Sequence, residues 1–401
     1  MGAPLPLKWD VENNVAWKIP LPDAGNSTPV IWKDRIYLTQ AIRDKNLRLL
    51  ICLDRRTGKI LWQSGPTFEG EEKTHRSNPY CAASPTTDGD RIYAQFGSAG
   101  VYCFDTNGKV VWKRDLGKQE HIWGYSSSPV LDGDRCILYF GPGENSFMVA
   151  LNKFTGETEW KHDEPDWKFG KRTDGFRGRD GEGVVGSFTS PLLIDTKGRR
   201  ELVMSFPTQL VALDPANGSP LWSCDGLNPL VYTSPIYADG ILVSMGGYNG
   251  STIAVRAGGK GNVTQERRLW KEVRSKKNYI GSGVIHQGYI YVLNSGGFLE
   301  CIELESGNKV YEERLKGKGA KGESWSSLLL SGDLIYAINQ SGDTFIVKAS
   351  PEFQLLGTNA LGEMTNSSIV AKGNELYIRT HEHLWCIRDS GIGPVGITPV
   401  P

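Results

Sequence analysis

Short apolar stretches separated by turn residues recur along the whole chain. Most are four to six residues long and rich in Val, Ile and Tyr, and they either alternate with polar residues or run apolar throughout, as half-buried and buried β-strands do. Dipeptides such as Asp88-Gly89 and Asn107-Gly108 separate them and tolerate the positive φ angles of tight hairpins. The pattern predicts an all-β protein built from hairpins.

These stretches form one module that recurs eight times. Each copy begins with Ser or Thr, commonly followed by Pro, and passes through three strands separated by glycine-containing turns to Thr-Gly-x-x-x-Trp. The clearest copies run from Ser84 to Trp112 and from Ser128 to Trp160. The eight starts lie near Thr28, Ser84, Ser128, Ser190, Ser234, Ser282, Ser327 and Ser368. A period of about 40–50 residues is typical of a four-stranded propeller blade.

The two ends of the sequence complement each other. The eighth repeat stops after its third strand, near residues 384–388, whereas the chain begins with an isolated last strand at residues 15–19 that carries Trp17. Pairing the two would complete the eighth blade and remove the exposed edges of an open array. A solenoid, the structural alternative, needs no such ends. We therefore predict a single eight-bladed β-propeller over residues 1–401, with four-stranded antiparallel blades and the last one closed by the N-terminal strand.

Two residue types recur at fixed positions of the module. Four residues after the turn glycine stands a large ring, which we expect to pack on the turn of the neighbouring blade. These rings are Trp62, Trp112, Trp160, Trp222 and Tyr311. One position of the third strand is small, and its occupants are Cys52, Cys103, Ala150, Ala212, Cys301 and Cys386. A position shared by Cys and Ala indicates packing, and without a CxxC motif nothing predicts a zinc or redox site.

The balance of charged residues argues against some classes of binding partner. The 45 Lys and Arg residues balance 45 Asp and Glu residues, which argues against nucleic acid or an anionic membrane as partner because both require a basic surface. No apolar run reaches the ~20 residues of a membrane span, and residues 1–6 do not resemble a secretory signal. The chain is either cytosolic or the mature part of an exported protein, and we expect a periplasmic or secreted location.

The repeat resembles a known family. The pattern SP-(apolar)-DG-(strand)-G-x-x-G-(strand)-D-x-x-x-G-K-x-x-W is similar to the PQQ-like repeat of β-propellers, a family that includes quinoprotein dehydrogenases and the propeller lipoprotein of outer-membrane assembly. The resemblance extends from Trp17 to Arg388, and the segments NNVAWKIPLPDAGNSTPVIWKDRIYLT and EHIWGYSSSPVL are similar to secreted bacterial propellers of this kind. It implies the propeller fold and, for the dehydrogenases, pyrroloquinoline quinone (PQQ) with calcium.

The cofactor implied by the dehydrogenases is not expected here. Those enzymes place a pair of adjacent cysteines against the quinone and hold calcium with acidic and amide ligands. This chain has no adjacent cysteines and no matching ligand set. We therefore predict no cofactor, and neither PQQ nor calcium.

The long insertions fall between the last strand of one blade and the first strand of the next. We expect every one of them on a single face, around the axial channel where binding residues concentrate, with only short turns on the opposite face. The insertions are residues 63–80, 114–125 and 161–187. The candidate ligand-binding residues on this face are His75, Arg76, Asn78, Tyr80, His121, Trp123, Tyr125, Arg177, Arg179, Asp180, Tyr232, Lys277, Tyr279, Trp325 and His383.

The candidate residues are compatible with more than one role for the axial channel. Aromatic rings with Asn, His, Arg and Glu suit sugars, which stack on rings and hydrogen-bond to polar groups. Alternatively the rings only fill the channel, which we favour for most of them. A histidine metal site would need imidazoles from separate blades within about 2 Å of one ion, and we predict no metal.

Three functions follow, in order of preference. The first is a non-enzymatic binding or scaffold propeller that contacts a protein or a glycan through the loop-bearing face. The second is a carbohydrate-active lyase or hydrolase, with His121 and either Glu120 or Glu323 as acid–base groups, although the chain has no GxSxG, HExxH or P-loop motif. The third is a PQQ-dependent oxidoreductase.

Overall fold

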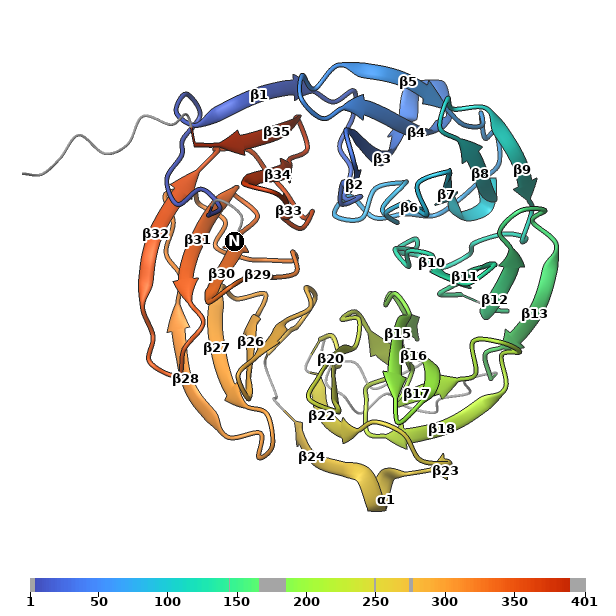
Figure 1. Ribbon diagram of the computed structural model, residues 1–401, viewed down its shortest axis with the longest axis vertical. Coiled ribbons are helices and arrows are strands. Elements are labelled where there is room, and N and C mark those ends of the chain that lie inside the picture. The colour runs from blue at the N-terminus through green and yellow to red at the C-terminus, as the bar shows by residue number, and fades with distance from the viewer. Residues whose placement is uncertain (1–3, 144, 166–184, 249, 274–276, 390–401) are drawn as a thin grey trace, which may run out of the picture.

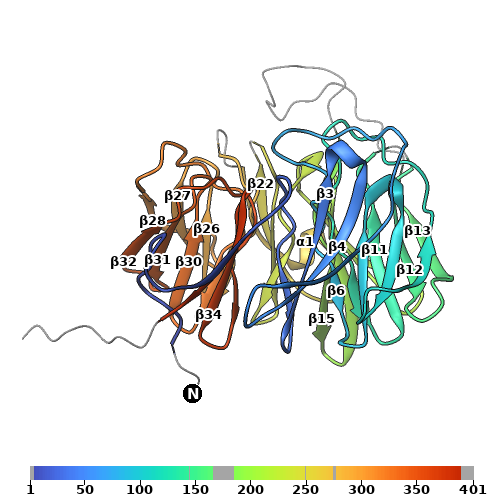
Figure 2. The same ribbon diagram turned by 90° about the horizontal axis from the view of Figure 1, so that it is seen from above.

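Eight β-sheets stand around a common axis in the computed structural model, which describes residues 4–143, 145–165, 185–248, 250–273 and 277–389 (Figure 1). Each blade is an antiparallel sheet whose first strand lies nearest the axis and whose last strand lies at the rim (Figure 1). Seen from the side, the strands run between two faces that carry the connecting loops (Figure 2). The predicted fold, an eight-bladed propeller of four-stranded blades, is confirmed.

The first four blades take up the chain as far as residue 225. Blade 1 contains β2 (Val30–Trp32), β3 (Arg35–Ile42), β4 (Leu47–Asp54) and β5 (Ile60–Ser64). Blade 2 contains β6 (Thr86–Thr87), β7 (Arg91–Gln95), β8 (Val101–Asp105) and β9 (Val110–Arg114). Blade 3 contains β10 (Val130–Asp132), β11 (Arg135–Phe140), β12 (Phe147–Asn152) and β13 (Thr158–Asp163). Blade 4 contains β15 (Leu192–Thr196), β16 (Arg199–Phe206), β17 (Gln209–Leu213) and β18 (Pro220–Asp225).

The other four blades complete the ring. Blade 5 contains β20 (Ile236–Ala238), β21 (Ile241–Met245), β22 (Ser251–Arg256) and β24 (Arg268–Val273). Blade 6 contains β25 (Val284–His286), β26 (Tyr289–Leu293), β27 (Phe298–Glu303) and β28 (Lys309–Arg314). Blade 7 contains β29 (Leu329–Ser331), β30 (Leu334–Ile338), β31 (Asp343–Lys348) and β32 (Leu355–Ala360). Blade 8 contains β33 (Val370–Lys372), β34 (Glu375–Arg379), β35 (His383–Arg388) and β1 (Val15–Pro20).

The ring is closed by pairing the two ends of the chain. β1 runs antiparallel to β35, with Trp17 opposite Cys386 and Ile19 opposite Leu384. Strand β1 is therefore the outer strand of blade 8 (Figure 1). The predicted closure of the last blade by the N-terminal strand is confirmed.

Large rings join neighbouring blades at the rim. We call Trp17, Trp62, Trp112, Trp160 and Trp270 the rim staples, because each lies on the turn glycine of the next blade and donates its Nε1–H to a carbonyl of that turn. A Cβ on Gly156 would come within 2.7 Å of the Trp112 ring, and Trp112 Nε1 lies 3.0 Å from the oxygen of Lys153. The expected packing of Trp62, Trp112 and Trp160 on neighbouring turns is thus confirmed.

The small position of the third strand has a direct explanation. It lies opposite the staple in the register, so that Cys52 pairs with Trp62 and Ala150 with Trp160. Because directly opposite residues share one face of a sheet, a small side chain leaves room for the ring. All seven cysteines of the chain are free and buried, and burial raises the pKa of Cys103 to about 12.

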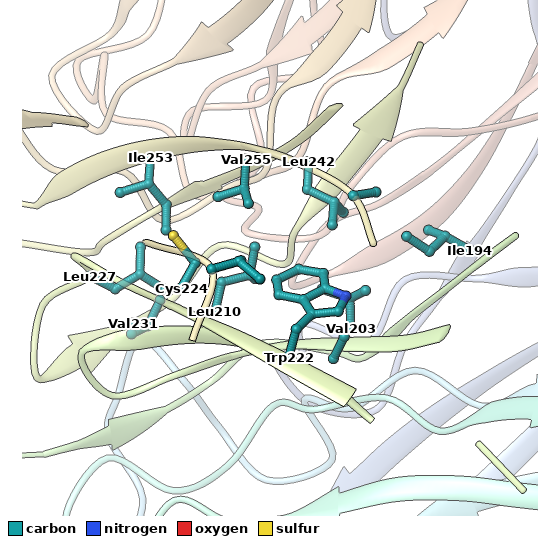
Figure 3. Packing of buried hydrophobic residues seen from close by; sticks show 13 residues of the cluster. Ile194, Val203, Leu210, Trp222, Cys224, Leu227, Val231, Leu242, Ile253 and Val255 are labelled. Atoms are coloured by element: carbon teal, nitrogen blue, oxygen red, sulfur yellow. The ribbon is translucent and has the colours of Figure 1, made fainter. Parts of the chain in front are cut away.

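Two of the predicted rings join blades in other ways. Trp222 is fully buried among Leu242, Val255 and other residues of blades 4 and 5 (Figure 3), and its Nε1 lies 2.8 Å from a Glu201 carboxylate oxygen. Tyr311 contacts the ring of Phe353 in the next blade edge-on at 5.5 Å.

The junction between blades 7 and 8 uses a tryptophan from outside the repeat. The outer strand β32 has Gly357 at the staple position, opposite Ile346. Trp9 is instead buried against Ile346 and Leu376, residues of the two blades. Its backbone N–H donates to Asn359 Oδ1 at 2.9 Å, which fixes the N-terminal segment on β32.

The expectation that every long insertion lies on one face is wrong. Blade 5 carries its insertion between the third and fourth strands, on the opposite face. This segment contains β23 (Gly261–Asn262) and α1 (Thr264–Arg267), and β23 adds a parallel strand to β18 of blade 4. It replaces the short Thr-Gly turn and is the reason why Trp222 lacks a turn glycine to lie on. No helix among the described ranges has the length and apolar character to cross a membrane.

Candidate functional site

A cavity of about 550 Å³ lies on the axis of the propeller. Most of its wall comes from residues just before the first strand of each blade, on the face that carries the connections between blades. This volume is within the ~300–1,000 Å³ range of small-molecule sites. The channel is therefore partly open, although aromatic side chains line it.

The floor of the cavity is a ring of eight hydroxyl residues, each two positions before the first strand of its blade. We call them the hydroxyl belt: Thr28, Ser84, Ser128, Ser190, Ser234, Ser282, Ser327 and Ser368. The backbone N–H of one member donates to the hydroxyl of the next at 2.8–3.3 Å, as Ser84 does to Ser128. At one step the bond is reversed, and the Ser282 hydroxyl donates to the Ser234 carbonyl at 3.3 Å.

A second ring of residues lies above the hydroxyl belt, and each of its members stands two positions before a belt residue in the sequence. We call it the upper ring: Asn26, Ala82, Ser126, Phe188, Tyr232, Ile280, Trp325 and Asn366. Side chains of extended backbone alternate in direction, so these positions and the belt point to the axis. The residues between them, such as Ser127 and Thr189, are buried away from it.

Aromatic residues cover the part of the wall at blades 4 and 5. The rings of Phe188 and Tyr232 stack with centroids 5.1 Å apart at 10°, and Tyr248 meets Tyr232 edge-on at 5.5 Å. Trp123, in the loop before blade 3, and Trp325, before blade 7, also line the cavity, and both are partly exposed.

Amides cover the opposite part of the wall, at blades 8 and 1. Asn26 and Asn366 both donate to the carbonyl of Ser77, at 2.8 and 3.1 Å. The same loop is held from blade 3, because the Asn78 amide donates to the carbonyls of Trp123 and Tyr125 at 2.9 and 3.1 Å. Residues 75–78 are thus fixed between the first and third blades at the cavity mouth.

Some of the candidate ligand-binding residues meet at this cavity. They are His75, Asn78, Trp123, Tyr232 and Trp325. Two candidate tyrosines lie behind the wall, because they stand three residues before the belt and so point away from the axis. Tyr125 is 2% exposed, and Tyr279 is fully buried with its hydroxyl 3.1 Å from Glu300.

The proposed acid–base groups do not converge. His121 is buried, accepts the N–H of Trp123 at 3.2 Å and packs edge-on against Phe188. Burial lowers the pKa of His121 to about 4. Glu120 points elsewhere and pairs with Lys118 at 3.5 Å, and Glu323 is exposed.

The remaining candidates form contacts away from the cavity. Arg76 is exposed, and the Tyr80 ring lies under the guanidinium of Arg48 at 3.9 Å. Lys277 bridges Glu300 and Glu312 at 3.2 and 2.6 Å, and His383 lies 2.9 Å from Glu363. Arg177, Arg179 and Asp180 lie outside the described residues.

Glu363, Glu382 and His383 are the one group of the described residues whose side chains could together hold a metal ion. One potential ligand atom of each lies within 4.8 Å of the others. Burial tends to raise the pKa of Glu363, but hydrogen bonds from Thr380, His383 and other groups hold it below its usual value. The ammonium of Lys18 lies 3.2 Å from the same carboxylate. This carboxylate already has a cationic partner.

Sequence reasoning missed most of the wall. Phe188, Tyr248 and the hydroxyl belt were not among the candidates, although the belt residues were used to mark the repeat. The signal was available, since alternation along an extended strand predicts that the residue two positions before each Ser or Thr shares its direction. Applied to each start, this rule finds the upper ring.

Comparison with known proteins identifies the family of the chain. Residues 7–168 and 149–391 match the PQQ-repeat family model described as outer membrane protein assembly factor BamB. The chain belongs to this BamB-like family. A curated relative, the outer membrane protein assembly factor BamB of Yersinia pestis, is 22% identical over 272 residues, which are 66% of this chain and 61% of that protein.

Solved structures show the same fold as this BamB-like chain. BamB from Moraxella catarrhalis has a TM-score of 0.65 at 14% identity and covers 94% of this chain and 98% of its own. The quinohemoprotein alcohol dehydrogenase of Comamonas testosteroni also has a TM-score of 0.65, at 12% identity, covering 94% of this chain and 78% of its own. A computationally designed protein, Ika8, has a TM-score of 0.61 at 12% identity and covers 92% and 98%.

The dehydrogenase fold raises the question whether this BamB-like cavity suits PQQ. The quinone carries carboxylates that require cationic or multiple N–H partners, and calcium requires carboxylate and carbonyl oxygens. Within the described residues, the cavity lining contains no Arg, Lys, Asp or Glu. No two cysteines of the chain are adjacent. The described lining does not fit PQQ with calcium.

Proposed function

We propose that this protein is a non-enzymatic binding propeller that works outside the cytoplasm, without PQQ or calcium, through the face that carries the axial cavity. The observation that carries the proposal is the chemistry of the cavity wall. It presents hydroxyl, amide and aromatic groups and the imidazole of His75 and, among the described residues, no carboxylate, ammonium or guanidinium. Acid–base catalysis needs ionisable groups that converge on the substrate, and the described lining offers a single imidazole without a carboxylate beside it. His121 is buried, Glu120 pairs with Lys118 and Glu323 is exposed.

Membership of the BamB-like family supports a protein partner and a location outside the cytoplasm. The curated relative is named as an assembly factor of outer membrane proteins. The loops around the cavity offer exposed apolar side chains for such a contact, including Ile122 at 48% exposure. We propose that these loops form the contact surface.

Site-specific photo-crosslinking in intact cells tests the contact surface. A photoreactive amino acid is placed at Ile122, on the loop-bearing face, and at Phe154, which lies in a turn of the opposite face with 43% exposure. We expect a product of defined mass from position 122 and none from position 154. Equal products from both positions, or a product from position 154 alone, would contradict the proposed face.

Turnover assays test the absence of catalysis. The purified chain is incubated with neutral and acidic polysaccharides, and new reducing ends and unsaturated products are measured. We expect none above the level of a heat-treated sample. Product formation that the His121→Asn substitution abolishes would establish the alternative, a carbohydrate-active enzyme.

A further inference from the structure

The axial cavity has two chemically different sides that face each other. In a ring of eight blades, blade 1 lies across from blade 5 and blade 8 across from blade 4 (Figure 1). In the upper ring, Asn26 is therefore opposite Tyr232, and Asn366 is opposite Phe188. A ligand in the cavity meets aromatic faces on one side and amides on the other.

The aromatic side has the form of a stacking surface. Tyr232 is supported by Phe188 from one direction and by Tyr248 from another, which fixes the orientation of its ring. Tyr232 and Tyr248 remain partly exposed, and so do Trp123 and Trp325. Fixed, partly exposed rings suit a ligand with flat C–H faces.

The floor supplies hydrogen-bonding groups in fixed positions. Seven of the eight belt hydroxyls accept a backbone N–H of the neighbouring blade, which leaves the hydrogen of each for another acceptor. Within the described residues, only Ser282 of the belt donates its hydroxyl hydrogen to a protein carbonyl. The other members present donors toward the axis, where oxygens of a ligand would accept them.

The charge of the site distinguishes between classes of polar ligand. A buried guanidinium, that of Arg379, lies near the wall, but it donates to the carbonyls of Ser27 and Thr39 at 3.0 Å and to Gln40 Oε1 at 2.6 Å. Its charge is thus directed into the protein and not into the cavity. Apart from the imidazole of His75, the described lining offers no acidic or basic side chain. A charged ligand would therefore lose its hydration in the cavity with little compensation from ion pairs, which is costly.

We propose that the axial cavity binds a neutral oligosaccharide, with one sugar ring stacked on the aromatic side at Tyr232, a further contact to Trp325 at blade 7, and the sugar hydroxyls on the amides and the hydroxyl belt. Sugars match both halves of the wall, because they carry flat C–H faces and hydroxyls that donate and accept. The proposal rests on the proposed function, since it assigns a ligand class to the same loop-bearing face.

Titration of the full-length chain with short neutral oligomers tests this ligand class. Oligomers of glucose, mannose, xylose and N-acetylglucosamine are added up to about 10 mM, where a complex with a Kd of about 1 mM is nearly saturated. Calorimetry and tryptophan fluorescence follow binding, because Trp123 and Trp325 line the cavity. We expect at least one neutral oligomer to bind, and its carboxylated or sulfated counterparts to bind at least tenfold more weakly.

Substitutions locate the binding. We expect Tyr232→Ala and Trp325→Ala each to weaken binding about tenfold or more, and Trp325→Phe to recover part of the loss because it restores a ring. Trp32→Ala is the matched control, since Trp32 is partly exposed but lies outside the cavity. An unchanged thermal unfolding temperature shows that a variant is folded, and Tyr232→Phe replaces Tyr232→Ala if the latter does not fold, with loss of binding then expected to be smaller than tenfold.

Three results would overturn the proposal: no binding of any neutral oligomer to the folded chain, preferential binding of charged oligomers or peptides, or equal loss in Trp32→Ala and Trp325→Ala. Failure here is distinguishable from failure of the proposed function. If crosslinking maps a protein partner to position 122 while no sugar binds, only the sugar inference falls. If an oligomer binds and is cleaved, the ligand class stands and the non-enzymatic function falls.

Discussion

The rim staples and the hydroxyl belt both join neighbouring blades through one contact repeated around the ring, but with opposite chemistry. At the rim, a ring such as Trp112 is buried on a glycine turn and makes a single hydrogen bond to Lys153. At the axis, a hydroxyl such as Ser128 accepts one backbone N–H and remains partly exposed to the cavity.

The difference separates stability from binding. Burial of a large apolar ring contributes several kcal/mol, whereas a solvent-accessible hydrogen bond contributes about 1 kcal/mol net. The rim can therefore hold the blades together while the axis keeps polar groups available. The following predictions test this division, from the largest expected effect to the smallest.

Removal of a rim staple should cost the most. We expect Trp112→Ala to lower the free energy of unfolding by about 3–5 kcal/mol, because it leaves a cavity between blades 2 and 3 and removes one of the two hydrogen bonds to the Lys153 carbonyl. Chemical denaturation of the variant and the parent measures the change. A loss below about 1 kcal/mol would contradict the assigned role of the rim.

The junction of blades 7 and 8 tests whether a tryptophan from outside the repeat can take the place of a rim staple. We expect Trp9→Ala to cost about 3 kcal/mol, although Trp9 lies in no strand, because its ring is buried against Ile346 of blade 7 and Leu376 of blade 8. Leu61→Ala, at a side chain with 49% exposure, is the control and should cost less than about 1 kcal/mol. Equal losses in the two variants would show that Trp9 is not a functional replacement.

Acid should destabilise the loops beside the axis more than the rim. His121 has a folded-state pKa of about 4 against an ordinary value of 6.5, so its contribution to stability is fully present above pH 6.5 and is lost as the pH falls toward 4. We expect a loss of about 2–3 kcal/mol from this group over that range. Denaturation of the parent and of His121→Asn at pH 7 and pH 4.5 checks this, and the variant should show the smaller pH dependence.

A pair of turn glycines separates backbone strain from contact with a staple. Gly156 and Gly240 have nearly equal positive φ angles, 76° and 78°, but only Gly156 lies against a ring, that of Trp112. Both alanine variants are destabilised by the strained backbone. The free energy of unfolding of Gly156→Ala should fall by about 1–3 kcal/mol more than that of Gly240→Ala, because the Trp112 ring must move. Thermal or chemical unfolding distinguishes them, and similar losses would mean that the ring shifts freely.

A belt hydroxyl should matter least for stability. We expect Ser128→Ala to cost about 0.5–1 kcal/mol, because water in the cavity can replace the acceptor of the Ser84 N–H. The same unfolding assay measures it beside Trp112→Ala. If Ser128→Ala cost as much as Trp112→Ala, the axis would carry the ring's stability and the division would be wrong.

The sequence predicted the features that repeat and missed those that do not. Trp62 and the closing strand, predicted at residues 15–19 and observed at Val15–Pro20, were found because the spacing of the module gives them a place. Trp9 could not be found in this way, since it replaces a ring missing at Gly357 and no spacing links the two positions. The insertion at residues 257–267 was overlooked for a similar reason, because it removes the turn motif by which the other blades were recognised.

The sequence predicted which loops surround the cavity, but not which of their side chains point into it. Trp123 and Tyr125 are two residues apart in one loop, yet only Trp123 lines the cavity while Tyr125 is buried behind it. Sequence proximity to the first strand therefore selected both. The pairing of Phe188 with Tyr232 comes from loops of different blades, and no local pattern records such a contact.

Closure by β1 and β35 has a consequence for the order of folding. Strand β1 is synthesised before all the other strands of the ring and its partner β35 after them, so blade 8 cannot form until the other seven blades have been made. Until then the growing chain presents two unpaired edges, on which other polypeptides could add strands. A chaperone that shields β1 during synthesis or export would therefore act at the step on which completion of the ring depends.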